Sequence, residues 1–458
     1  MTTIAILILS VTGTSASQIG ELHDGSNLTD SQLQGVNLAQ AHLNRTDLSY
    51  SSLQGADLSR SYLISSRFVG ARLDGSILAK SNMIGADLSS STAIGADFSG
   101  AKMSRVSLQG SDLSGANLAG ADLTGANIIN ANLSGADLSG AVLQEARMSG
   151  ANFTRANLKG AIMNSANFTD ADLTGVDMSH ASLSESRMPG ATLAGANLAN
   201  ADLTGANMDS VDLDGADLTG SRLFSANLMY AHMSGVLLGR ANLIAARLSW
   251  ADLKKCEMSG SLLSRAELYS TDLSGSDLSG SDFTRAYMMR SNLSGARMDG
   301  ANLAYADLTE ADLSYASLKG AKIPNLDLTR ADLSRADLTG VLLEFNEMVS
   351  TDLNGAKMAR VTISRLAMRD VNMSGTDLRD AKISVSLMER VNLSRADLSG
   401  ASLDVLYMTD SDLRMANLLR IKCDPFTLPY LAASRLEGAL MSNTLHLQLN
   451  SSRVLPET

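Results

Sequence analysis

The chain lacks the features that small secreted domains rely on. Its 458 residues include two cysteines, Cys256 and Cys423, and five prolines, so no disulfide framework can be read from them. Aromatic residues make up 4% of the chain, which predicts a thin core of Leu, Met and Ala rather than one of large rings. Cys256 stands where a small residue recurs, so we expect a buried thiol that packs as a small apolar group.

Long hydrophobic runs are also missing. The apolar stretch at residues 4–9 (IAILIL) is too short to cross a membrane, so no membrane span is expected. Followed by Thr-Gly-Thr-Ser-Ala, it has the character of a signal peptide cleaved near Ala16, although Met-Thr-Thr before it carries no Lys or Arg. The alternative is a strand that caps the first repeats. We favour a cytoplasmic protein, with a secreted or periplasmic one as the alternative if residues 1–16 are removed.

Motifs for catalysis and metal binding are absent from the sequence. It contains no Walker loop and no dinucleotide fingerprint. Its five histidines are scattered and offer neither a cluster of metal ligands nor a general base beside a nucleophile. We therefore predict that the protein is not an enzyme and has no catalytic residues, no cofactor and no metal site.

Positive charge is scarce in the first half of the chain. The formal net charge is −11; residues 1–220 hold 21 acids and 11 bases, and residues 221–458 hold 27 acids and 26 bases. A surface that binds nucleic acid needs clustered bases to neutralise phosphates. No direct binding to nucleic acid is therefore expected.

One five-residue pattern runs through nearly the whole chain. From Leu28 to Leu418, 79 consecutive units place Leu, Met, Phe or Ile at the same position, with Ala93 as the only exception. Two residues earlier stands a small residue, usually Ala or Ser, and between them most often Asp or Asn. Ser or Thr follows the apolar centre, and then commonly Gly or Arg. An unbroken register of this kind predicts a single repeat array rather than several globular domains.

A period of five fits neither a helix nor a continuous strand. It fits a short extended segment that ends in a bend. In such a segment Ala171 and Leu173 point to the same side and Asp172 to the other. Thr174 and Gly175 then turn the corner, where Gly and Ser accept unusual backbone angles or bond locally to the main chain. The pattern predicts buried centres and outward Asp and Asn side chains.

These units resemble the pentapeptide-repeat family, whose consensus A-(D/N)-L-x-x is matched at 121–123, 201–203 and 331–333. The resemblance implies an all-β fold, a right-handed quadrilateral parallel β-helix with four units per turn. It would form a rod of about 20 coils, on the order of 95 Å long at a coil spacing of about 4.8 Å. We expect residues 1–25 to form an N-terminal apolar segment, residues 26–420 the β-helix and residues 421–458 a C-terminal cap.

The tail breaks the register and predicts a cap made of a short helix and a strand. Leu428, Ala432, Leu436 and Leu440 recur every four residues, as on one face of a helix. The leucines at 445, 447 and 449 alternate with polar residues, as in a strand. A cap that covers the last coil is favoured over a dedicated dimerisation element, and a homodimer through this segment is the alternative.

Large outward side chains gather in one neighbourhood of the repeat. Tyr230 and Trp250 are twenty residues apart, which places them one coil apart if four units make a turn. A contiguous exposed apolar patch suggests an interaction surface, and Trp and Tyr are favoured as anchors. Local packing of these side chains on one another is the alternative. The candidate partner-binding patch comprises Phe224, Met229, Tyr230, Ile244, Trp250, Tyr269 and Met289.

A second departure affects the small inward position of one column. It becomes Leu326, Leu366 and Leu406, and the polar Asn346 lies among them. We expect a locally reshaped face there. A buried Asn346 should find hydrogen-bond partners.

The repeat architecture and the patch favour a non-catalytic scaffold that binds another protein, whose identity the sequence does not reveal. The resemblance implies an alternative, because some family members are acidic rods that imitate DNA, protect DNA gyrase and dimerise through a C-terminal helix. A secreted bacterial effector or an envelope-associated protein is the third reading.

Overall fold

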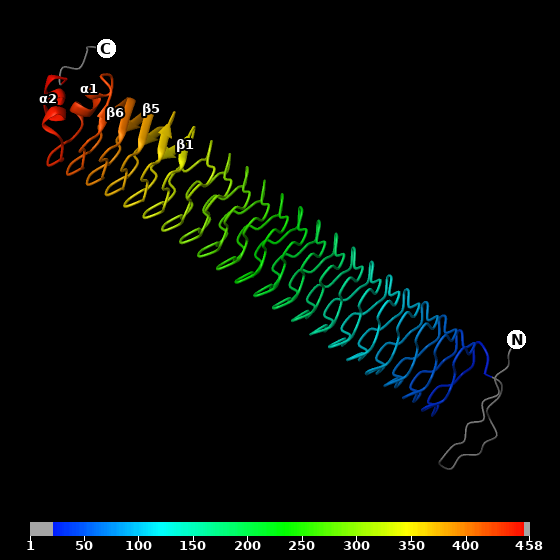
Figure 1. The fold of residues 1–458 in the computed structure, drawn as a ribbon. Coiled ribbons are helices and arrows are strands. Elements are labelled where there is room, and N and C mark those ends of the chain that lie inside the picture. The colour runs from blue at the N-terminus through cyan, green and yellow to red at the C-terminus, as the bar shows by residue number, and fades with distance from the viewer. Residues whose placement is uncertain (1–21, 453–458) are drawn as a thin grey trace. The chain divides into compact units, whose positions relative to one another are not determined.

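The computed structural model describes residues 22–452, which fall into two compact units, Met1–Asn227 and Leu228–Thr458 (Figure 1). In each unit the chain winds as a stack of parallel coils, a β-solenoid. The predicted fold class is therefore confirmed. The number of coils and the continuity of one array over residues 26–420 stay predictions, and most of the predicted N-terminal segment lies outside the described residues.

Each coil takes twenty residues. In unit 1 parallel bridges join residues twenty apart, from Asn27 and Asp47 to Asn207 and Asn227, and unit 2 has the same spacing from His232 and Asp252 onward. Four pentapeptides therefore make one turn. Every coil binds its neighbours through the backbone: in unit 1, for example, the Leu173 N–H donates to Thr192 O at 2.7 Å. These ladders supply the hydrogen bonds that no single unit can make alone.

The corners explain the order of residues within a unit. Asp172 Oδ1 accepts the backbone N–H of Thr174 at 3.0 Å, and Leu173 O accepts the N–H of Val176 at 3.1 Å. Gly175, at the fifth position, has φ of +64°, which a turn with a left-handed third residue requires. The hydrogen bonds and backbone angles of one corner thus explain the order of residues in a unit: Asp or Asn first, then Leu, then Thr or Ser, and finally Gly.

The core consists of the apolar centres and the small residues beside them. Every centre from Leu33 to Leu418 is buried, including Ala93. Cys256 is buried as predicted, and its Sγ donates to Met233 O at 3.1 Å. Alternation of inward and outward side chains, read from the sequence, therefore holds throughout the described repeats.

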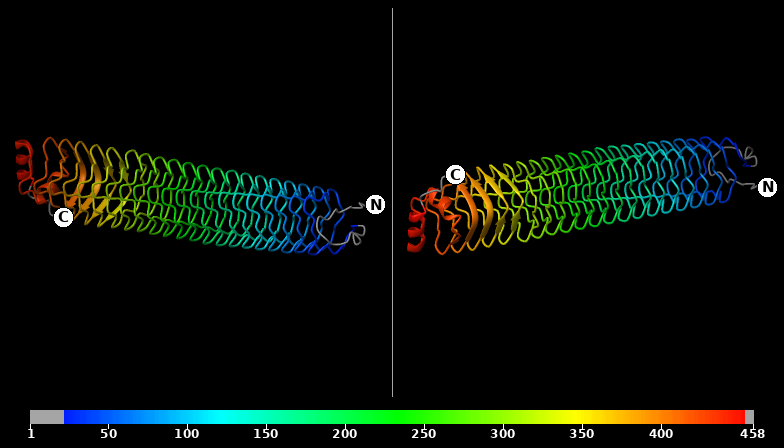
Figure 2. Two further views of the ribbon diagram at one scale, coloured as in Figure 1. Left: turned by 90° about the horizontal axis from the view of Figure 1, so that it is seen from below. Right: turned by 90° about the horizontal axis from the view of Figure 1, so that it is seen from above.

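Strands occur in the coils around Asn346, Leu366 and Leu406, which replace the small inward residue of one column, although the strand Lys382–Glu389 keeps the small Ser386 there. The strands are β1 (Leu342–Glu344), β2 (Glu347–Val349), β3 (Thr362–Ser364), β4 (Ala367–Arg369), β5 (Lys382–Glu389), β6 (Ser402–Thr409) and β7 (Lys422–Cys423) (Figure 2). They form one parallel sheet in which β5 pairs with β3, β4 and β6, and β6 also pairs with β7. The strands β5 and β6 continue through a corner that interrupts the strands of the other coils.

The corner that β5 and β6 span lies on the face that the sequence predicted to be reshaped. Val385 and Val405 occupy its fifth positions with φ of 45° and 51°, although β-branched residues rarely take the left-handed region. Asn346 is buried, and its Nδ2 donates to Ile323 O. Its Oδ1 has no partner among the described atoms, so the expected hydrogen bonding is only half met.

The C-terminal cap consists of two helices, α1 (Leu428–Ala433) and α2 (Asn443–Ser451). The strand predicted for residues 445–449 is wrong, because Ser442 Oγ accepts the Leu445 N–H at 3.2 Å and starts a helix there. Leu445 and Leu449, four residues apart, are buried, whereas Leu447 between them is 70% exposed.

The predicted helix over 428–440 is also too long. Beyond Ala433 the chain returns to the coil register, and Arg435 and Leu440 bridge Asp412 and Asn417. These partners are twenty-three residues apart instead of twenty, so α1 is accommodated within one enlarged coil. Neither helix of the described part is long enough to cross a membrane.

Side chains of the cap complete the hydrogen bonding of β6. Asp424 Oδ2 accepts the Val405 N–H at 2.7 Å, and Thr427 Oγ1 accepts the Leu406 N–H at 2.9 Å. Burial raises the pKa of Asp424, but hydrogen bonds from Thr427 and from the Val405 and Phe426 backbone outweigh it and leave the pKa lowered. The two side chains thus replace carbonyls that a further coil would supply.

Candidate protein-interaction surface

Two aromatic residues occupy turn positions that usually hold small or flexible residues. Tyr230 and Trp250 stand at the fifth position of their units with φ of 58° and 61°. A left-handed residue other than glycine costs about 1–2 kcal/mol, but many corners of this chain carry such residues, Arg and Ser among them. Tyr230 and Trp250 are among the bulkiest side chains at these positions, which also include Tyr305, Tyr315 and Phe345.

The two rings stack on each other along consecutive coils. Their centroids are 5.1 Å apart and their planes differ by 5°. Tyr269 meets Trp250 edge-on, at 5.3 Å and 72°. Tyr230 and Trp250 remain 48% and 45% exposed, so about half of each residue is accessible although the two rings stack.

A chain of charged side chains holds the far end of this row. Arg290 Nη1 donates to the Tyr269 hydroxyl at 2.9 Å, and its Nε donates to Glu310 Oε2 at 2.7 Å. Arg330 pairs with the other oxygen of Glu310 at 3.2 Å. The hydrogen bond from Arg290, followed by that from Arg330, lowers the pKa of Glu310. The orientation of Tyr269 is therefore set by an ion-pair ladder.

The remaining predicted residues are distributed around this stack. Met289 is 36% exposed, and its carbonyl accepts the Ser270 N–H at 3.0 Å, directly after Tyr269. Met229 is exposed and precedes Tyr230. Ile244 is half-buried at the preceding corner of its coil. Phe224 belongs to unit 1, where it is 45% exposed, so the surface described for unit 2 does not include it.

Sequence reasoning missed Tyr287, which is 57% exposed and two residues before Met289. Its carbonyl accepts the N–H of Leu268, the neighbour of Tyr269, at 2.7 Å. The signal was present, since Tyr replaces the usual Asp or Asn of the second position. We call Tyr230, Trp250, Tyr269, Tyr287 and Met289 the aromatic corner.

A second aromatic cluster, near the cap, was also missed. Tyr407 meets Phe426 at 4.9 Å and Tyr430 at 5.4 Å, between ring centroids. Phe426 and Tyr430 lie beyond the repeat register, so their contact with Tyr407 could not be read from a spacing of twenty. The exposed valines of β5 and β6 belong to the same part of the sheet.

Possible metal ligands do not cluster within the described part of the chain. Among residues 22–452 no group of three or more His, Cys, Asp or Glu side chains could hold a metal ion. Burial raises the pKa of the Cys423 thiol to about 12, which keeps it protonated and poorly nucleophilic at neutral pH. That the protein is not an enzyme stays a prediction.

Several solved structures similar to this chain are pentapeptide repeat proteins. HetL, involved in heterocyst differentiation regulation in the cyanobacterium Nostoc, is 26% identical, with 57% of this chain and 90% of HetL covered and a TM-score of 0.18. QnrB1, a plasmid-mediated fluoroquinolone resistance protein, is 18% identical, with 53% and 97% covered and a TM-score of 0.22. Superpositions this weak support no argument about function.

A third structure is a pentapeptide repeat protein of the Arabidopsis thaliana thylakoid lumen. It is 30% identical, with 25% of this chain and 66% of that protein covered and a TM-score of 0.17. A comparison with curated protein sequences gives no significant match.

The family model described as pentapeptide repeats (8 copies) matches most of the chain. Its matches are residues 26–63, 66–105, 101–140, 121–160, 151–188, 190–223, 221–260, 246–285, 266–303, 291–325, 301–344, 327–365 and 386–418. Both the motif and the solenoid that it builds are now established. The chain therefore belongs to the pentapeptide repeat family.

Proposed function

We propose that this protein is a non-catalytic scaffold that binds another protein through the aromatic corner. The observation that carries the proposal is the half-exposed stack of Tyr230 and Trp250 at turn positions that disfavour bulky residues. Aromatic side chains of this kind dominate the binding energy of many protein interfaces.

The corner is also preorganised. Trp250 is held on one face by Tyr230 and on the other by the edge of Tyr269, whose hydroxyl is fixed by Arg290. Little side-chain freedom remains to be lost when a partner binds, which improves affinity. A partner with an apolar side chain could insert against the exposed ring edges and Met289.

A paired comparison of variants tests the proposal. Replacing Tyr230 and Trp250 with Ser should abolish partner capture from the native host and leave the melting curve nearly unchanged. The matched control replaces Tyr305 and Tyr315, which are 56% and 60% exposed at equivalent turn positions of unit 2. Normal capture by the first variant, together with a lower melting temperature, would show that the corner is local packing only.

A DNA mimic that protects or inhibits a topoisomerase such as gyrase is the second candidate. Its support is the acidic excess of residues 1–220, which hold 21 acids and 11 bases. In unit 1 two ion pairs neutralise acids, Arg67 with Asp47 and Arg222 with Asp202. Much of that charge is therefore available to an outside partner.

The spacing of the charges ranks this candidate lower. In one column of unit 1 Asp and Asn alternate, and Asn117 Nδ2 donates to Asp97 Oδ1 at 3.1 Å, with the same bond from Asn197 to Asp177. A carboxylate on every second coil recurs at about 9.6 Å, whereas duplex DNA carries a charge about every 1.7 Å. A gyrase supercoiling assay tests this candidate by comparing the natural protein with a variant whose outward Asp residues between Asp172 and Asp217 are reversed in charge. If neither protein changes the supercoiling activity of gyrase, the candidate is eliminated.

Assembly and location remain proposals. A homodimer through the cap would use exposed Leu440 and Leu447, which are 59% and 70% exposed, and the mass in solution of a Leu447→Asp variant tests it.

A cytoplasmic protein remains our preference. N-terminal sequencing of the mature protein decides between it and a secreted effector or envelope protein, because residues 1–16 lie outside the described residues.

A further inference from the structure

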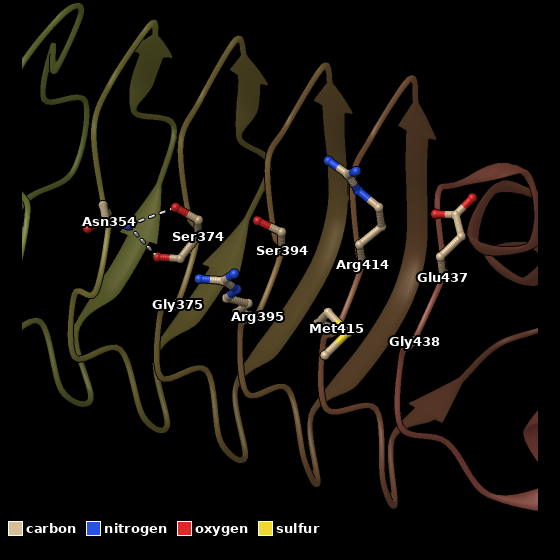
Figure 3. A pocket seen from close by; sticks show the side chains of 9 residues that line it. All are labelled: Asn354, Ser374, Gly375, Ser394, Arg395, Arg414, Met415, Glu437 and Gly438. Carbon is tan, nitrogen blue, oxygen red and sulfur yellow. Dashed lines mark hydrogen bonds between the residues drawn. The ribbon is translucent and has the colours of Figure 1, made fainter.

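An open hollow of about 670 Å³ lies on one side of unit 2 near its C-terminal end (Figure 3). Its residues come from five successive coils and lie at the same corner of each. Small residues make its floor, and Arg395 and Arg414 rise from it. The lining residues are Asn354, Ser374, Gly375, Ser394, Arg395, Arg414, Met415, Glu437 and Gly438.

Hydrogen-bond donors dominate the N-terminal half of the hollow. The Arg395 guanidinium has no ion pair or hydrogen bond to any described residue, and Figure 3 shows it directed toward the coil of Ser374 and Gly375. Ser374 Oγ accepts from Asn354 Nδ2 at 2.7 Å and donates to Asn372 Oδ1 at 2.8 Å, so its proton is already engaged. The Ser394 hydroxyl forms no hydrogen bond with a described residue. A free guanidinium beside this hydroxyl donor suits a carboxylate or phosphate.

The C-terminal half has the opposite character. Arg414 is held by Asp412, with Nη2 to Oδ2 at 2.6 Å and Nε to both oxygens at 3.0 Å. The side chain of Glu437 lies beyond it and repels anions. Met415 is 62% exposed and covers Gly438, where any Cβ would meet its sulfur. An anionic group is therefore favoured at Arg395, and an apolar group along Met415.

We propose that this hollow binds a small amphiphilic anion, with its carboxylate or phosphate on Arg395 and Ser394 and its apolar part against Met415. The site is separate from the aromatic corner and does not depend on the proposed scaffold function. Its volume lies within the range of small-molecule pockets, about 300–1,000 Å³.

Calorimetric titration of the full chain tests the proposal with four probes: hexanoate, hexyl phosphate, inorganic phosphate and hexanol. We expect saturable binding of hexanoate or hexyl phosphate, weaker binding of inorganic phosphate and none of hexanol. The stronger of the two alkyl probes identifies the preferred anionic group. Arg395→Gln should weaken that probe by about tenfold or more, since it removes charge-assisted hydrogen bonds.

The matched control is Arg360→Gln. Arg360 is exposed and has φ of 59°, against 60° for Arg395, but lies outside the hollow. The Arg360→Gln variant should bind every probe with unchanged affinity. The Met415→Ser variant should bind hexanoate and hexyl phosphate more weakly and inorganic phosphate with unchanged affinity. Equal losses in the two arginine variants, binding of hexanol as strong as that of hexanoate, or binding of an acidic peptide but no small molecule would each overturn the proposal.

Discussion

At the scale of single residues, the units of the repeat close their turns with the same kind of local hydrogen bond. The acidic or amide residue at the second position accepts the N–H of the residue two later, as Asp122 does for Thr124 at 3.0 Å. That this residue points outward could be read from the period. Its bond to the turn could not, because periodicity reports which side a residue faces and not what it contacts.

Asp122 shows what this acceptor contributes. It also accepts from the hydroxyls of Thr124 and Ser104, both at 2.6 Å. Asp122→Ala should lower the stability of unit 1 by about 1–2 kcal/mol, whereas Asp122→Asn keeps an acceptor oxygen and should cost less than half of that. Thermal melting followed by circular dichroism measures both, and equal losses would show that charge rather than the turn bond matters.

The same residue predicts a pH dependence. Burial raises the pKa of Asp122, but hydrogen bonds from Ser104 and Thr124 outweigh it, so the pKa is lowered. A carboxylate with a lowered pKa stabilises the fold above its unfolded pKa, and this contribution is lost as the pH falls below about 4. The Asp122→Asn variant should lose less stability than the natural protein when the pH falls from about 5 to about 3, a range of about one unit on either side of the unfolded pKa. Identical acid curves would contradict the assignment.

At the scale of elements, the repeats were predictable and the cap was only partly so. Leu445 and Leu449 fit a period of two as well as one of four, and only the position of Leu447 separates a strand from a helix. Ser442 caps α2, but a cap residue decides the structure only together with burial of the face that follows. The long strands β5 and β6 likewise depend on packing inside the coil, where β5 places Ser386 and β6 places Leu406.

Substitutions in α2 discriminate the two structures. In the helix Leu449 is 4% exposed and Leu447 is 70% exposed. Leu449→Ala should therefore destabilise the cap by about 2–4 kcal/mol, and Leu447→Ala should change it by less than about 0.5 kcal/mol. A strand would place both on one face and predict similar losses. Hydrogen exchange of the α1 and α2 amides reports the difference.

Thr427 is the residue that completes the edge of β6. Thr427→Val keeps the shape but removes the acceptor of the buried Leu406 N–H, which should cost about 1–3 kcal/mol. The Leu406 amide should then exchange faster, while Thr427→Ser, which retains the hydroxyl, should protect it nearly as well as the natural residue. Unchanged exchange in the valine variant would mean that the cap does not depend on this bond.

At the scale of the whole molecule, the spacing of twenty connects the fold to the candidate surface. Met348, Met368 and Met388 recur at that spacing in the sequence, and they are paired in register between strands. The same spacing predicted that Tyr230 and Trp250 would meet. It also placed Tyr269 in the candidate patch, but it could not predict the contact of Tyr269 with Arg290, because that contact depends on side-chain orientation at the corner and on an ion pair with Glu310.

Cross-linking from the aromatic corner itself tests the central claim most directly. A photoreactive phenylalanine derivative would replace Trp250, the only tryptophan of the chain, in cells that make the protein naturally, and in a second culture it would replace Tyr315. The scaffold account predicts one dominant protein adduct from position 250 and none of that mass from position 315. No adduct at position 250, or the same set of adducts from both positions, would contradict it.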